Sequence, residues 1–141
     1  MELPWLSRWQ PQLLALLRIV TGLLFLEHGL SKYFAFPVPF PVHPLPPMLM
    51  AAGAIELITG TLVTIGLFTR FAAFVASGEM AVAYFMFHFP KGFYPAVNMG
   101  EAAILYCFLF LYIAAAGPGG WAIASPSHRR RTLPLHRSCP T

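Results

Sequence analysis

The chain has 141 residues, of which 57% are hydrophobic and 10% charged, and it carries a formal net charge of +4. Soluble domains carry about 25% charged residues, so this composition excludes an ordinary soluble enzyme and indicates a membrane protein. The length suits one compact domain of about four spanning helices, each needing about 20 apolar residues, and leaves no room for a soluble catalytic domain.

Residues 1–11 are predicted to form a short interfacial head, because they combine two tryptophans with Arg8. The first spanning helix is predicted over residues 12–34. Polar and small residues recur on one of its faces, which we expect to pack against protein: Arg18, Gly22, Gly29 and Lys32, with His28 at the border. Glu27 lies on another side of the helix, which suggests a second contact, with a neighbouring chain.

The segment from residue 36 to 47, FPVPFPVHPLPP, contains six prolines. Because proline lacks a backbone N–H donor, this segment cannot continue a helix or form a central strand. We expect an extended flap over one membrane face, and a stiff linker is the alternative.

The second helix is predicted over residues 48–66, with Glu56 near its middle. Gly53 and Gly60 share a face with Glu56, since they lie three residues before it and four residues after it. An ionised group at that depth costs about 3 kcal/mol in lipid, whereas a small-residue face lets another helix approach closely. Glu56 is therefore expected to point into the protein.

The third helix is predicted over residues 70–88 and forms an antiparallel hairpin with the second. Gly66 is expected to end the second helix, and Thr69 to cap the third. A second small-residue face with a carboxyl group in it runs along the third helix: Ala72, Ala76, Glu79 and Ala83.

The fourth helix is predicted over residues 98–116, where the sequence GPGG stops it. Asn98 and Glu101 have the spacing of a capping box at its start. Residues 121–141 are predicted to form a basic cytoplasmic tail with little regular structure. The tail contains four of the arginines: Arg129, Arg130, Arg131 and Arg137.

The positive charges predict the orientation of the four spans. Both termini and the turn between the second and third helices share one side, which carries Arg8, Arg70 and the tail arginines, against Lys32 and Lys91 opposite. The positive-inside rule therefore predicts an all-α, four-helix transmembrane bundle with both termini cytoplasmic. We interpret the basic tail as a topology signal and a lipid-facing patch, and we expect no nucleic-acid partner.

Acidic residues are distributed one to each predicted helix: Glu27, Glu56, Glu79 and Glu101. Left unpaired in lipid, the four would together cost on the order of 10 kcal/mol, so each must be protonated, paired or hydrogen-bonded. We predict that Glu56 and Glu79 are the catalytic, proton-exchanging groups, because a carboxyl group in a low-dielectric site can exchange a proton near neutral pH. Structural hydrogen bonding between helices is the alternative.

The remaining candidate ligand-binding residues lie mostly towards the outer side: Glu27, His28, Lys32, His88, Asn98 and Glu101. Arg18 lies nearer the inner side, where it would bind ligand, pair with a carboxylate or extend to the interface. No metal site is predicted, since the sequence lacks the Glu-x-x-His pair of di-iron bundles, and we expect neither haem nor a covalently bound cofactor. Cys107 and Cys139 are too far apart for a redox dithiol or a zinc cage.

These residues belong to one pattern that extends from about residue 14 to residue 120. It comprises Arg18, Gly22, Phe25, His28, Gly29 and Lys32, then Gly53, Glu56, Gly60, Gly66, Thr69 and Arg70, and finally Asn98, Glu101 and Gly117-Pro118-Gly119. The pattern resembles the DoxX family of small bacterial four-helix membrane proteins. The resemblance implies a multi-pass protein of the inner membrane. It also implies relatives linked to sulfur-compound oxidation with electrons passed to quinone, or to redox and detoxification complexes.

The leading hypothesis is a membrane subunit of a redox assembly that binds a quinone or a similar apolar molecule. Its pocket would open towards the outer leaflet, with Glu56 at the floor and the proline-rich segment at the mouth. Because the sequence has no cofactor motif, we expect membrane lipids and a redox partner subunit, or further copies of the chain, as partners. Two alternatives remain: a proton-coupled carrier or channel using the same carboxylates, and a scaffold without chemistry.

Overall fold

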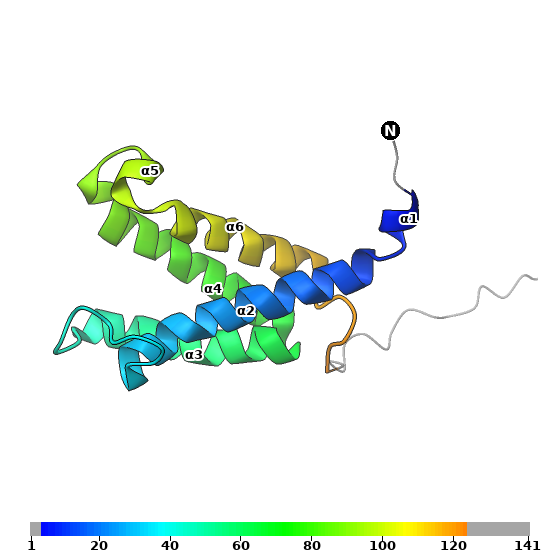
Figure 1. Cartoon of the computed structure of the whole chain (residues 1–141), viewed down its shortest axis with the longest axis horizontal. Coiled ribbons are helices and arrows are strands. Elements are labelled where there is room, and N and C mark those ends of the chain that lie inside the picture. The colour runs from blue at the N-terminus through cyan, green and yellow to red at the C-terminus, as the bar shows by residue number, and fades with distance from the viewer. Residues whose placement is uncertain (1–3, 124–141) are drawn as a thin grey trace, which may run out of the picture.

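A computed structural model describes residues 4–123, and all regular structure in this range is helical (Figure 1). Four helices are long: α2 (Gln10–Phe34), α3 (Pro47–Ile65), α4 (Thr69–Ala83) and α6 (Glu101–Ala116). Short elements complete the chain: α1 (Pro4–Ser7), the π-helix η1 (Tyr84–His88), the 3₁₀ helix η2 (Phe89–Lys91) and α5 (Pro95–Asn98). The predicted tail lies outside the described residues, apart from residues 121–123.

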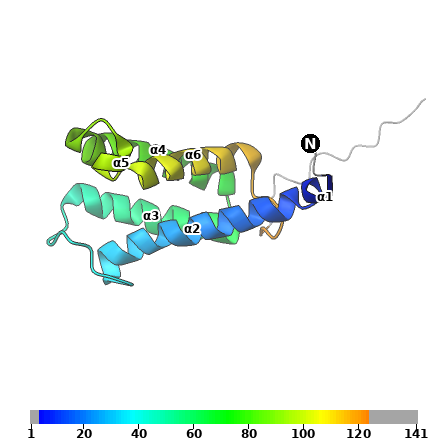
Figure 2. The ribbon, with the colours of Figure 1, turned by 45° about the horizontal axis from the view of Figure 1, so that its top comes forward.

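The long helices pack in two antiparallel pairs, α2 with α3 and α4 with α6 (Figures 1 and 2). The start of α2, the turn between α3 and α4, and the end of α6 lie together at one end of the molecule, which we call the terminal end. The segments 35–46 and 89–100 lie at the other end, the loop end. Figure 1 shows the two pairs closer together at the terminal end than at the loop end.

Three helical stretches are long and apolar enough to cross a membrane: α2, α3 and the continuous run Thr69–Lys91. The prediction of an all-helical protein is therefore confirmed for the described residues, and by length and composition three of its helices could span a membrane. The apolar helix α6 has only 16 residues and is shorter than the other three.

Glycines let α2 and α3 approach backbone to backbone, as the small-residue face predicted. A Cβ atom on Gly60 would lie 2.9 Å from the backbone nitrogen of Leu26. On the other helix, a Cβ atom on Gly29 would lie 3.0 Å from the carbonyl oxygen of Gly53. Real Cβ atoms almost never lie within 3.0 Å of another heavy atom, so a larger residue at Gly60 would force the two helices to shift, and one at Gly29 would be tightly packed.

The second small-residue face packs α4 against its neighbours and is also confirmed. Ala72 and Ala76 are buried beside Phe110 and Ile113 of α6. Ser77 adds an interhelical hydrogen bond, since its hydroxyl donates to the carbonyl oxygen of Cys107 at 2.8 Å. Small polar side chains of this kind are common between packed membrane helices.

The turn between α3 and α4 confirms one predicted residue role and corrects another. Gly66 ends α3 in the left-handed conformation (φ +78°), with its N–H bonded to the carbonyl oxygen of Leu62. Thr69 does not cap α4, because Phe68 takes the preceding position (φ +48°) and Thr69 is itself the first helical residue. The Thr69 hydroxyl is buried and has no hydrogen-bond partner in the described structure.

The predicted capping box at the start of the fourth helix is wrong. Asn98 instead stabilises the connection before α6: its Nδ2 donates to the carbonyl oxygen of Gly92 at 2.7 Å, and its Oδ1 accepts from the N–H of Gly100 at 2.7 Å. The helix begins at Glu101, three residues later than predicted, with Gly100 before it and no side-chain cap. A turn that already uses both ends of the Asn98 amide cannot also offer it as a cap.

Candidate functional site

Lys32 and Glu56 form a buried ion pair between α2 and α3. Lys32 is 8% exposed and Glu56 3%. The Lys32 ammonium donates to both carboxylate oxygens, and its contact with Oε2 is 2.5 Å. Helical side chains lean towards the start of their own helix. Because α2 and α3 are antiparallel, Lys32 and Glu56 lean in opposite directions and so towards each other.

The proline-rich segment folds back over this ion pair. Its Phe40 ring lies under the Lys32 ammonium, with 5.5 Å from Nζ to the ring centroid, which is cation–π geometry. The hydroxyl of Ser31 donates to the carbonyl oxygen of Val38 at 2.8 Å and fixes the start of the segment on α2. The segment therefore covers the loop end of the pair and adds a partner to the cation.

Glu79 of α4 brings a third ionisable group to the same region. Its carboxyl group lies within electrostatic range of Glu56 and Lys32. Both of its carboxyl oxygens are buried, and neither has a hydrogen-bond partner within residues 4–123. Buried polar groups are nearly always hydrogen-bonded, so an unpartnered carboxyl group marks a place where a partner is missing. We call Lys32, Glu56 and Glu79 the charged cluster.

His28 and Glu27 lie one turn along α2 from this cluster and are exposed. The His28 ring packs edge-on against the ring of Tyr106 of α6, with centroids 6.0 Å apart. His28 also interacts electrostatically with Lys32. The pair His28–Tyr106 therefore lies between α2 and α6 at the lateral border of the region that holds the cluster.

Glu101 is exposed in the first turn of α6, so the structure does not bring it together with the buried Glu56. His88 and Asn98 instead stabilise the loop end, where His88 Nδ1 lies 3.1 Å from the carbonyl oxygen of Asn98. Of the predicted site residues, the structure brings together Lys32 of α2, Glu56 of α3 and Glu79 of α4. Two pockets of about 450 and 690 Å³ lie at the terminal end, and Glu56 lines neither of them.

Arg18 is fully buried at the terminal end and pairs with backbone carbonyls instead of a carboxylate. Its Nη1 donates to the carbonyl oxygens of Val63 and Thr64, at 2.5 and 2.6 Å, at the end of α3. Its Nε and Nη2 donate to those of Pro118 and Trp121, at 2.8 and 3.1 Å. A cation at the end of a helix satisfies carbonyl groups that have no partner inside the helix.

Arg70 does the same for α6, a role that the sequence reasoning missed. Its Nη1 donates to the carbonyl oxygens of Ala114 and Ala115, at 3.0 and 2.6 Å. In the sequence, Arg70 was interpreted as a topology signal and as part of the family pattern. Its predicted position, on the same side as the helix end at Gly117, was a hint of this capping.

No group of three or more His, Cys, Asp or Glu side chains that could hold a metal ion occurs in the described part of the chain. What the cluster offers chemically is one paired carboxylate, one paired ammonium and one carboxyl group that can donate or accept a hydrogen bond.

The fold and the cluster define a helical membrane protein with ionisable groups between its spans. Residues 13–89 match the family model DoxX, and the chain belongs to the DoxX family. It is also 44% identical over 124 residues to an uncharacterised protein of Haemophilus influenzae, covering 84% of this chain and 92% of the relative. No solved structure matches the chain.

Proposed function

We propose that the protein is a membrane subunit of a redox assembly and binds a quinone or a similar apolar carbonyl compound at the charged cluster. A bound carbonyl oxygen would accept a hydrogen bond from the protonated carboxyl group of Glu79. Lys32 and Glu56 would hold the polar end of the site, and a partner subunit would supply the electrons.

The unpartnered carboxyl group of Glu79 supports this proposal most directly. Lys32 already has Glu56 as its partner, so the described part of the chain, residues 4–123, leaves Glu79 without a hydrogen bond. An apolar molecule with a carbonyl group supplies what is missing, and it can reach the site through the membrane. His28 and Tyr106 at the lateral border would be the first polar groups that it meets.

Replacing Glu79 tests the proposal in purified protein. We expect Glu79→Leu to weaken the binding of decylubiquinone about fivefold to tenfold, as for the loss of one hydrogen bond. The same change should keep or raise the unfolding midpoint, because it removes a buried polar group that has no partner. Glu101→Leu is the matched control, since Glu101 is exposed, and it should leave binding within twofold.

Two results would contradict this proposal. Equal binding by Glu79→Leu and the unchanged protein would remove Glu79 from the site. Proton flux into vesicles that contain only this protein, abolished by Glu79→Gln and indifferent to quinone, would instead favour the proton-coupled carrier.

We also propose that α6 is the fourth span and that the terminal end faces the cytoplasm of the bacterial inner membrane. The charge balance supports this orientation, with the tail arginines and Arg70 on one side. A single cysteine placed at position 127, with both native cysteines replaced, should react with an impermeant thiol reagent only after the cells are opened. Labelling in intact cells would show that the orientation is the opposite of the proposed one.

A further inference from the structure

We propose that the terminal end binds one anionic phospholipid, with its phosphate at Arg70 and an acyl chain along the leucines of α2. This site is separate from the charged cluster and does not depend on the proposed redox function. It consists of two pockets that adjoin, since Gln10 and Leu14 line both of them.

The larger pocket, of about 690 Å³, combines a cation with apolar walls. Arg70 lines it together with three aromatic residues: Phe68, Phe71 and Trp121. Within residues 4–123 Arg70 has no acidic partner, and its hydrogen bonds go to the carbonyl oxygens at the end of α6. An arginine has five N–H donors, so donors remain for a phosphate oxygen.

The first turn of α4 contributes further donors to this pocket. Thr69 and Phe71 line it, and no side chain of the described residues caps the N-terminus of this 15-residue helix. Thr69 is only 4% exposed, and its hydroxyl has no hydrogen-bond partner among residues 4–123. A helix N-terminus favours an anion, and the unpartnered hydroxyl is a second group at the same place that lacks an acceptor.

Trp121 closes one side of the pocket in a fixed but strained backbone conformation. Its φ is +54°, which is rare for a bulky residue, and its side chain is exposed. The carbonyl oxygen of Trp121 accepts a hydrogen bond from the buried Arg18. The backbone N–H groups of Gly120 and Ile123 donate to the carbonyl oxygens of Pro11 and Ile65. Tryptophan is enriched where membrane proteins meet lipid headgroups, so this exposed indole suits such a contact.

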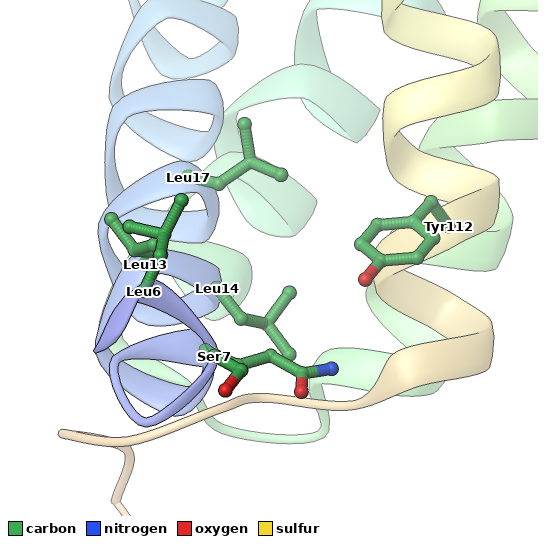
Figure 3. A pocket seen from close by; sticks show the side chains of 7 residues that line it. Leu6, Ser7, Leu13, Leu14, Leu17 and Tyr112 are labelled. Atoms are coloured by element: carbon green, nitrogen blue, oxygen red, sulfur yellow. The ribbon is translucent and has the colours of Figure 1, made fainter. Parts of the chain in front are cut away.

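The smaller pocket, of about 450 Å³, provides a place for an acyl chain (Figure 3). Tyr112 of α6 lines it on one side. Leucines of α1 and α2 line it on the other: Leu6, Leu13, Leu14 and Leu17. An apolar groove that continues into a cationic pocket suits a molecule with one anionic end and one long apolar end. A phospholipid has that chemistry, and free phosphate has only half of it.

Lipid titration of the delipidated, detergent-solubilised protein, read by native mass spectrometry, tests this site. We expect dioleoyl phosphatidylglycerol to bind about tenfold more tightly than dioleoyl phosphatidylcholine, and Arg70→Gln to remove that preference. Arg8→Gln is the matched control, because it removes an exposed arginine of the same end that lines neither pocket. It should keep the preference.

A second variant keeps the test decisive if Arg70→Gln does not fold. Tyr112→Ala changes an exposed side chain of the acyl groove, and it should weaken dioleoyl phosphatidylglycerol severalfold without affecting the short-chain dihexanoyl lipid. Three results would each overturn the proposal. The two headgroups could bind equally, or Arg8→Gln and Arg70→Gln could lose the headgroup preference to the same extent. Inorganic phosphate could also displace the lipid at equal concentration.

Discussion

Gly60→Leu should abolish stable folding of the detergent-solubilised protein. A single Cβ atom at this position would already lie 2.9 Å from the backbone nitrogen and 3.0 Å from the Cα of Leu26, so α2 and α3 would have to separate. We expect a loss of about 3 kcal/mol or more in the free energy of unfolding, at the upper end of the cost of overpacking. Thermal unfolding followed by circular dichroism measures it.

The matched control is Gly78→Leu, which makes the same change on α4. A Cβ atom at Gly78 would meet no heavy atom of residues 4–123 within 4 Å, and this glycine is exposed. Leucine also has a higher helix propensity than glycine, so the control should unfold at the same temperature or higher. If Gly60→Leu yields no folded protein, Gly60→Ala against Gly78→Ala gives the graded comparison. Equal midpoints in that pair would show that the α2–α3 crossing is not this close.

Lys32→Met should cost about 3 kcal/mol or more in the free energy of unfolding. It leaves the Glu56 carboxylate buried without its partner, and breaking a buried ion pair from one side typically costs about 3–5 kcal/mol. Lys91→Met is the control, since Lys91 is exposed at the same end of the molecule, and it should change the unfolding midpoint little.

The double variant Lys32→Met/Glu56→Leu separates pairing from packing. With both charges replaced by apolar side chains of similar size, most of the lost stability should return, because neither desolvation nor an unpaired charge remains. A double variant that is as unstable as Lys32→Met alone would mean that the lysine matters for its packing and not for its charge.

The sequence predicted the helix crossing well because a helix places residues on faces by a fixed period. Gly22, Gly29 and Lys32 on α2, and Gly53, Glu56 and Gly60 on α3, follow from that period alone. All six are buried in the structure, and both predicted small-residue faces lie at helix interfaces. Periodicity therefore predicted which faces meet, without giving the register between the helices.

Partner choice was harder to predict, because it depends on that register and on backbone groups that every residue carries. Lys32 was one of several cations available to Glu56, and only the packed helices select it. Arg18 was equally suited to pair with a carboxylate, yet it donates to backbone carbonyl oxygens. Such groups occur at every residue, so the sequence cannot show which of them Arg18 will contact. Asn98 had the spacing of a cap, but a turn competed for both ends of its amide.

The predicted site residues differ in burial for a reason that the sequence could not show. Depth along a helix placed Glu27, Glu56 and Glu101 at similar levels, but depth says nothing about direction around the bundle. The structure buries Glu56 and exposes the other two. Glu79, predicted as a proton-exchanging group, is the member of the cluster whose carboxyl oxygens have no hydrogen-bond partner within residues 4–123.

Infrared difference spectroscopy of the purified protein, with and without decylubiquinone, tests most directly whether Glu79 binds the ligand. We predict that binding shifts a carboxyl C=O stretching band and lowers the carbonyl frequency of the quinone through a new hydrogen bond. In Glu79→Gln the carboxyl band should disappear from the difference spectrum, while Glu101→Gln should leave it unchanged. A carboxyl band that persists in Glu79→Gln, or a quinone carbonyl frequency equal to that in detergent alone, would contradict the account.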